Sequence, residues 1–292
     1  MTQDQVIARD APAFEFGRNW QRFLELFSEQ RVQTAVDSIR DFTGVPDLKG
    51  KSFVDVGCGS GLFSYAAHRL GAEPVVSFDV DEFSVRCCRH LHEHAGTPAS
   101  WTVRPGSILD EQFVADLGTF DMVYSWGVLH HTGRMWDAIR NAGGMVNPGG
   151  CFYITIYNAR RGVRGSGTWL RIKRVYNRMP PAGRKLMESV YVTNYFLSRL
   201  IRFRNPMKRI RDYQQKRGMN WRTDVTDWIG GYPYECATVQ EIFDFVRQTF
   251  PDFLLEGLKS TRGLGTNWFL FRRAITASPA DPGGQAPGPP GS

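Results

Sequence analysis

The chain has 292 residues, of which 42% are hydrophobic and 22% charged, a composition typical of a soluble globular protein and not of a disordered or fibrous one. No apolar run approaches the roughly 20 residues that span a bilayer, and residues 1–10 lack the basic and apolar regions of a signal peptide. The five cysteines show no spacing typical of disulfides or of a zinc site. We therefore expect a cytoplasmic protein.

The formal net charge of +7 is unevenly distributed. Residues 160–217 include 17 basic and two acidic side chains, whereas the rest of the chain has 19 basic and 27 acidic ones. Such a basic segment can be a solvated surface, a binding site for an anionic acceptor or a nucleic acid, or a contact with an anionic membrane that delivers a lipid such as a quinone. The sequence leaves these three interpretations open.

The first part of the chain, 1–44, has aromatic residues at helical spacing, namely Phe16, Trp20, Phe23 and Phe27. Apolar residues continue this spacing to position 39, which predicts one or two amphipathic helices. From 45 to 158, short apolar runs alternate with helical patterns. Strands are predicted at 52–56, 74–80, 101–103, 120–126 and 151–157. Helices are predicted at 62–70, 82–93 and 135–146. This alternation favours parallel β-α-β units in a doubly wound sheet.

The alternation stops after residue 158. Residues 159–236 are basic, aromatic and mostly helical in pattern, which predicts a helical cap inserted into the sheet domain. Residues 237–275 then supply a last helix at 238–250 and two strands at 253–258 and 268–272, which complete a mostly parallel α/β sheet of seven strands. Residues 276–292 are rich in Pro, Gly, Ala and Ser and are predicted to form a disordered tail.

A glycine-rich turn, DVGCGSG at 55–61, follows the first predicted strand. Glycines there permit positive φ and let a ligand approach the backbone closely. The third glycine comes one residue too early for the dinucleotide fingerprint. Asp79 ends the second strand, where a carboxylate can accept both hydroxyls of a ribose. A turn of this form, followed by this acid, resembles the class I S-adenosylmethionine-dependent methyltransferases that act on small molecules and natural products.

The resemblance implies S-adenosylmethionine as the cofactor and assigns roles around it. Asp55 and the glycine backbone would hold the methionine part, Asp79 the ribose, and the segment after the third strand the adenine. The family often has an acid where this chain has Ser107, and Asp110 has the pattern of a helix cap. The residues placed around the cofactor are Asp55, Gly57, Gly59, Gly61, Asp79, Ser107, Ile108, Trp126 and, from the N-terminal lid, Arg18.

Two adjacent histidines, His130 and His131, follow the fourth strand in the segment WGVLHH, which resembles the same region of quinone and natural-product methyltransferases. This edge of an open α/β sheet is where ligands bind. An alcohol must lose a proton as it attacks, and histidine can accept that proton near neutral pH. We predict His131 as the base and His130 as a positioning residue; the alternative is that both only cap a helix or fill space. No carboxylate accompanies the pair, so no metal site is predicted.

Aromatic residues and one acid flank the insertion and are the predicted acceptor-binding residues: Tyr157, Tyr232, Tyr234 and Glu235. Such rings suit a ring-shaped hydroxylated acceptor, although most aromatic residues of the cap would build its core. The expected reaction is O-methylation of a small molecule, a saccharide or glycosylated natural product. The alternatives are a tRNA methyltransferase that uses the basic cap, a methyltransferase of a quinone-type lipid, and a non-catalytic cofactor-binding protein.

Overall fold

The computed structural model describes residues 27–163, 165–203, 205, 207 and 221–275. The predicted N-terminal aromatic helix with Arg18, and the predicted tail at 276–292, lie outside these residues. Seven strands form one sheet in the order β3-β2-β1-β4-β5-β7-β6. Their bounds are Phe53–Val56 (β1), Val75–Asp79 (β2), Trp101–Pro105 (β3), Phe120–Ser125 (β4), Val146–Tyr157 (β5), Phe253–Lys259 (β6) and Thr266–Arg273 (β7). Strands β1 to β5 are parallel and β7 is antiparallel to both its neighbours, which confirms the predicted fold class.

Strand β5 begins at Val146, five residues before the predicted start at Cys151. Residues 147–150, which precede the predicted strand, bulge out of the pairing with β4, since Phe120 pairs with Val146 whereas Met122 pairs with Cys151. Gly150 permits this path because a side chain there would lie 2.8 Å from the carbonyl oxygen of Asn147. The predicted start of this strand was therefore wrong, and the glycines form an irregular entry into it.

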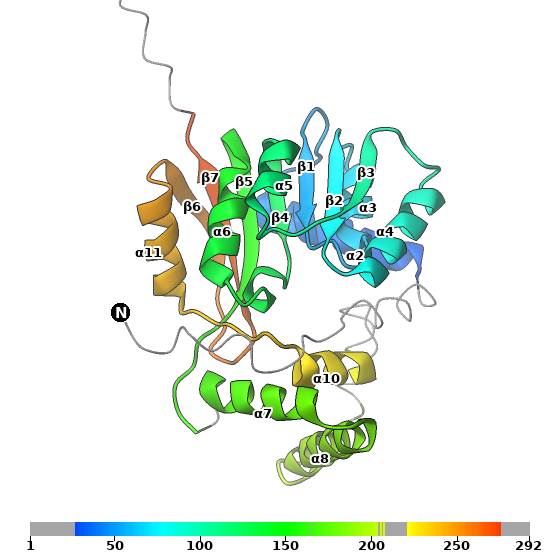
Figure 1. Cartoon of the computed structure of the whole chain (residues 1–292), viewed down its shortest axis with the longest axis vertical. Coiled ribbons are helices and arrows are strands. Elements are labelled where there is room, and N and C mark those ends of the chain that lie inside the picture. Colours follow the sequence, from blue (N-terminus) through cyan, green and yellow to red (C-terminus); the bar gives the residue numbers. More distant parts are fainter. Residues whose placement is uncertain (1–26, 164, 204, 206, 208–220, 276–292) are drawn as a thin grey trace, which may run out of the picture.

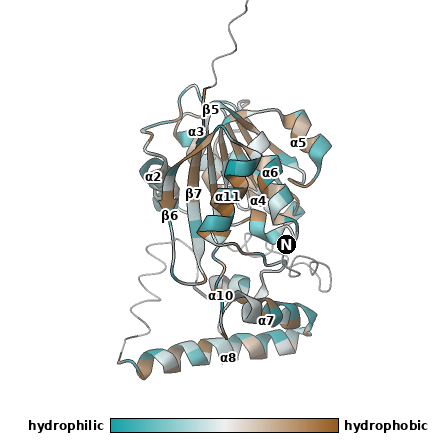
Figure 2. Ribbon diagram, turned by 90° about the vertical axis from the view of Figure 1, so that its left-hand side faces the viewer, coloured by the Kyte–Doolittle hydropathy of each residue, from teal (hydrophilic) through white to brown (hydrophobic). Residues whose placement is uncertain are grey.

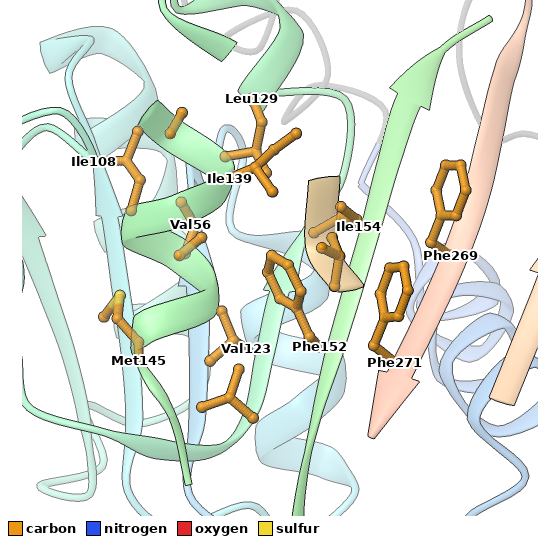
Figure 3. Close-up of a cluster of buried hydrophobic side chains, with 14 of the residues drawn as sticks. Val56, Ile108, Val123, Leu129, Ile139, Met145, Phe152, Ile154, Phe269 and Phe271 are labelled. Carbon is orange, nitrogen blue, oxygen red and sulfur yellow. The ribbon is translucent and has the colours of Figure 1, made fainter. Parts of the chain in front are cut away.

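Six helices cover the two faces of the sheet (Figure 1). One face packs against α2 (Glu29–Thr43), α3 (Leu62–Arg69) and α4 (Glu82–His94), and the other against α5 (Glu111–Leu117), α6 (Met135–Gly144) and α11 (Val239–Thr249). Figure 3 shows the second of these cores, where side chains of α6 meet those of the central strands. Strands buried on both faces are apolar along most of their length, which is why the short runs predicted them well.

Local capping groups fix several helix ends. The side chain of Asp81 accepts the backbone N–H groups of Phe83 and Ser84 at the start of α4. Asp110 accepts the N–H of Phe113 at the start of α5, as its pattern in the sequence indicated. Thr238 forms a capping box at the start of α11. These ends come directly after strands or loops of the sheet and set where each loop leaves the core.

Among the described residues between β5 and α11, three further helices lie beyond the sheet and are named the cap helices: α7 (Ser166–Arg178), α8 (Pro181–Leu200) and α10 (Trp221–Gly230). Figures 1 and 2 show them together past one end of the strands, with α8 farthest from the sheet. They have a small core of their own around Tyr176 and Ile229, and no residue of α8 is fully buried. Within the part of the chain that the structure describes, no helix is both long and apolar enough to cross a membrane.

Candidate active site

The glycine-rich turn is tightly enclosed at the end of β1. Gly57, Gly59 and Gly61 have φ angles of 74°, 52° and 80°, which side chains rarely adopt. A Cβ on Gly57 would lie 2.4 Å from Cγ1 of Val128, and one on Gly61 would lie 2.7 Å from Sγ of Cys88. Because β1 and β4 are neighbours in the sheet, the turn after β1 packs directly on the loop that leads to the two histidines.

Asp55 lies at the start of this turn and is almost completely buried. One of its oxygens, Oδ2, accepts a hydrogen bond of 2.6 Å from Oγ of Ser64, which in turn accepts one of 2.7 Å from Ser77. The chain of hydrogen bonds ends at the Trp101 indole N–H, 2.8 Å from the Ser77 hydroxyl. Burial, with a smaller contribution from Asp79, raises the pKa of Asp55 to about 7. Sequence reasoning missed this support, since its members come from three separate elements.

Asp79 ends β2 beside the same turn. Its two oxygens accept the backbone N–H groups of Gly59 at 3.0 Å and of Asp81 at 2.9 Å. Burial raises the pKa of Asp79 to about 6, although these hydrogen bonds oppose the shift. The two carboxylates therefore flank the glycine turn, as the sequence motif predicted they would, and they could accept hydrogen bonds from a cationic group and from sugar hydroxyls. In the described residues, no three His, Cys, Asp or Glu side chains are grouped as a metal site would need.

Three other residues predicted to contact the cofactor lie near this edge of the sheet or under it. Oγ of Ser107 accepts the backbone N–H of Leu109 in the loop after β3. Ile108 is buried in the core beneath α6 (Figure 3), so its side chain packs there. The half-buried ring of Trp126 lies 4.5 Å from that of Trp268. Their contacts with a cofactor remain predictions.

The two histidines form a short 3₁₀ turn, Leu129–His131, after β4. Nδ1 of His130 donates to the carbonyl oxygen of Thr155 at 3.1 Å, and Nδ1 of His131 donates to that of Pro233 at 2.6 Å. A carbonyl oxygen only accepts, so in each ring Nδ1 carries the hydrogen and Nε2 is the basic nitrogen. His130 is completely buried, whereas His131 is partly exposed.

Burial makes both imidazoles weak bases in the absence of a ligand. It lowers the pKa of His131 to about 3, with a contribution from the charge of Lys173, and it lowers that of His130 well below its ordinary value. Both rings are therefore neutral at pH 7. Nε2 of His130 is buried and has no hydrogen-bond partner in the described part of the chain.

Aromatic side chains surround the histidines. The ring of Tyr157, at the end of β5, lies 4.1 Å from that of His130 and 5.4 Å from that of His131. The ring of Tyr234 lies 5.2 Å from that of Tyr157, so both tyrosines belong to one aromatic cluster beside the histidines, and their contact with an acceptor stays a prediction. Tyr232 is 1% exposed, which leaves its ring no solvent-facing surface in this structure. Contact between Tyr232 and the acceptor therefore stays a prediction.

Glu235 has a structural contact that the sequence did not indicate. Its carboxylate accepts the backbone N–H of Met135, the first residue of α6, at 3.1 and 3.2 Å, and its own N–H donates to the carbonyl oxygen of His130 at 2.9 Å. Burial raises the pKa of this carboxyl to about 6. Glu235 therefore caps α6 and ties the segment after α10 to the histidine turn.

We expect Glu235→Ala to lower the free energy of unfolding by about 0.5–2 kcal/mol, because a helix would lose its N-terminal acceptor. Glu235→Gln keeps an acceptor oxygen and should lose less. Denaturant unfolding of both variants measures this. If Glu235→Gln folds normally but has a strongly raised KM for the acceptor, the residue also binds substrate as the sequence analysis predicted.

Lys173, on α7, is the residue near the histidines that sequence reasoning missed. It is completely buried, and its Nζ donates a hydrogen bond to the carbonyl oxygen of Trp228. Nζ lies 4.7 Å from the ring centroid of Trp228 and 4.8 Å from that of Tyr234. Burial lowers the pKa of Lys173 to about 7. Among 17 basic residues in its segment, nothing in the sequence separated it from the others.

Comparison with known proteins gives a family match over residues 27–223, to a model described as a methyltransferase domain. The ubiquinone biosynthesis O-methyltransferase of Methylobacterium sp. (strain 4-46) is 32% identical over 169 residues, 54% of this chain and 66% of that protein. A tRNA U34 carboxymethyltransferase of Methylococcus capsulatus is 32% identical over 106 residues, 36% of this chain and 32% of that protein. The chain thus spans just under two thirds of the first relative and about a third of the second.

A solved structure also resembles the fold. Magnesium protoporphyrin IX methyltransferase from Synechocystis PCC 6803, with bound SAH, superposes with a TM-score of 0.50. The match covers 88% of this chain and 94% of that one, at 14% sequence identity. At this identity the likeness concerns the fold alone, and it agrees with the strand order described above.

Proposed function

The chain belongs to the methyltransferase domain family and depends on S-adenosylmethionine, and we propose that it methylates a hydroxyl oxygen of a small molecule, a saccharide or glycosylated natural product. The observation that carries the proposal is the histidine turn after β4. There Nδ1 of His131 donates to the Pro233 carbonyl, which leaves Nε2 as the basic nitrogen of the ring. The centroid of the His131 ring lies 5.4 Å from that of the Tyr157 ring. A neutral imidazole with a basic Nε2 can accept a proton from a hydroxyl group, and the low pKa of His131 means that it must become a stronger base when the acceptor is bound.

The residues at the end of β1 and β2 fit the cofactor. The glycine turn has no room for side chains, and the carboxylates of Asp55 and Asp79 lie on either side of it. Tyr124 on β4 pairs with Asp55 on β1. Its hydroxyl is buried and has no hydrogen-bond partner among the described residues. We infer that Asp55 and the glycine backbone hold the methionine part and that Asp79 holds the ribose, with Ser107 and Ile108 toward the adenine and Trp126 beside the cofactor after β4.

The raised pKa of Asp55 predicts pH-dependent cofactor binding. The carboxyl is protonated below about pH 7, and it must lose that proton to bind a cationic amino group. The dissociation constant of S-adenosylhomocysteine should therefore rise about tenfold per pH unit as the pH falls below 7, and be constant above it. Titration calorimetry between pH 5 and 8 measures this. Asp55→Asn should bind more weakly with no such slope, and a wild-type affinity independent of pH would contradict the assignment.

S-adenosylmethionine supplies an electrophilic methyl group on a sulfonium sulfur. The chain must hold the acceptor hydroxyl in line with it and remove the hydroxyl proton. In our proposal Nε2 of His131 takes that proton, and the Pro233 carbonyl keeps the ring in the correct tautomer. His130 donates a hydrogen bond to the Thr155 carbonyl and packs on Tyr157, and it would thereby hold the histidine turn in place. The rings of Tyr157, Tyr234 and Trp228 would bind a flat or ring-shaped acceptor.

A quinone-type lipid is a second candidate acceptor. One observation that favours it is the similarity to a ubiquinone biosynthesis O-methyltransferase, and another is α8, where apolar side chains at helical spacing are exposed. These side chains are Leu186, Val190, Leu197 and Leu200. A tRNA acceptor has the support of the basic segment and of the partial similarity to a tRNA carboxymethyltransferase.

The test is incubation of the protein with methyl-labelled S-adenosylmethionine and separated fractions of cell extract: small polar molecules with glycans, lipids, and RNA. We expect label in the polar fraction, in a bond that resists the mild alkali that cleaves methyl esters. Label in lipid would replace the proposed acceptor by the quinone-type one. Label in RNA, with binding that weakens steeply as salt rises, would overturn the small-molecule proposal.

A further inference from the structure

Lys173 is a buried cation with unused hydrogen-bonding capacity. Its ammonium group has three N–H donors, and the Trp228 carbonyl accepts one of them. No acid forms an ion pair with it in the described part of the chain, and Asp227 acts on its pKa only through longer-range attraction. The rings of Trp228 and Tyr234 offset part of the cost of burying the charge. Buried ammonium groups are normally paired with an anion, so two donors without a partner indicate a missing one.

The ammonium lies next to the histidine turn. The ring centroid of Tyr234 lies 4.8 Å from Nζ of Lys173 and 5.2 Å from the ring centroid of Tyr157. The Tyr157 centroid in turn lies 4.1 Å from that of His130. The positive charge is close enough to lower the pKa of both His130 and His131. Lys173 and the histidines thus face the same aromatic cluster, with Nε2 of His130 as a second buried polar atom that lacks a partner there.

Helix capping alone does not explain a charged residue at this position. Lys173 and Asn177 both reach the C-terminal end of α10, where Nδ2 of Asn177 donates to the Gly230 carbonyl at 2.6 Å. Lys173 bonds a different carbonyl of the same helix end, that of Trp228, and the neutral amide of Asn177 shows that such a bond can be made without the cost of a buried charge. Asn177 is equally buried and on the same helix, one turn away, which makes it a matched control for Lys173.

We propose that Lys173 binds a carboxylate or phosphate group of the acceptor and thereby selects anionic acceptors for the reaction at His131. This inference rests on the proposed function, of which it names the substrate class. Burial is the main cause of the lowered pKa of His131, and the charge of Lys173 adds to it; the bound anion would neutralise that second contribution, so that the imidazole becomes a stronger base when the correct acceptor is present. A neutral analogue would leave the histidine a weak base. Selection and activation would then depend on the same contact.

The first test measures binding and does not depend on turnover. Benzoate and benzamide have the same ring and differ in charge, so we would titrate each into the protein saturated with S-adenosylhomocysteine and follow calorimetry or tryptophan fluorescence. Wild type should prefer benzoate by about tenfold or more. Lys173→Met, which keeps the length of the side chain, should lose the preference, and Asn177→Ala should retain it. Equal behaviour of the two probes with wild type, or an unchanged preference in folded Lys173→Met, would overturn the proposal.

The second test uses the labelled product. Small polar product from the extract experiment should be retained on an anion exchanger at pH 8, and Lys173→Met should raise KM for its formation much more than it lowers the affinity for S-adenosylhomocysteine. Label in small polar molecules that are not retained on the exchanger would contradict only the role of Lys173, and would leave the proposed small-molecule acceptor standing. Label in RNA or neutral lipid would instead contradict the proposed acceptor itself, so the two failures are distinguishable.

Discussion

Replacement of His131 by glutamine is expected to lower kcat by about 10²–10⁴-fold, the contribution of a positioned general base. Glutamine has nearly the size of histidine but no basic nitrogen. In the wild type, the Pro233 carbonyl accepts a hydrogen bond from Nδ1 of His131. It can accept one from the side-chain amide of the glutamine instead, so the turn should keep its shape. The affinity for S-adenosylhomocysteine should not change, because His131 is not among the residues proposed to hold the cofactor. Turnover with the accepting fraction and titration calorimetry measure the two effects separately.

Two further variants make this result interpretable. His92→Gln is a matched control, since His92 also contacts a proline carbonyl, that of Pro98 at 3.3 Å, but lies on α4 away from the histidine turn. It should keep normal turnover. His130→Gln tests the positioning role and should lower turnover less than His131→Gln. If His131→Gln and His130→Gln both turn over normally, neither histidine takes part in the reaction, and both only pack the loop.

Gly57→Ala is expected to lower the free energy of unfolding by about 2–5 kcal/mol. An alanine at its φ of 74° costs roughly 1–2 kcal/mol, and displacing Val128, whose Cγ1 would lie 2.4 Å from the new Cβ, costs roughly 1–3 kcal/mol more. The displacement would also move the loop that carries the histidines. Both stability and affinity for S-adenosylhomocysteine should therefore fall, as denaturant unfolding and calorimetry would show.

Gly50→Ala separates the two costs. Gly50 has a similar φ of 66°, but a Cβ there would meet nothing within 4 Å. This variant should lose only the smaller amount and should bind S-adenosylhomocysteine normally. Equal destabilisation of the two variants would show that contact with Val128 does not constrain the turn. The prediction of close packing between the cofactor turn and the histidine loop would then be wrong.

The sequence by itself determined the sheet, because its signals are local. Short apolar runs that alternate with helical periodicity predicted every strand of the sheet, with β3, β5, β6 and β7 longer than expected. The glycine turn with Asp79 predicted where two carboxylates would meet. The early start of β5 escaped prediction, since a Pro-Gly-Gly run looks like a turn until it is paired with β4. Each of the successes depends on neighbours within a few residues or on the general geometry of parallel strands.

Only the tertiary structure decided which polar side chains are buried and what they contact. Glu235 caps a helix 100 residues earlier in the chain, and Lys173 bonds a carbonyl 55 residues away. The side chain of Ile108, predicted beside the adenine, also packs in the core under α6. A lysine, a glutamate or an isoleucine carries no mark of such long-range contacts in its own neighbourhood. The proposed acceptor site depends on long-range contacts of this kind, because burial and electrostatics depend on elements that folding brings together.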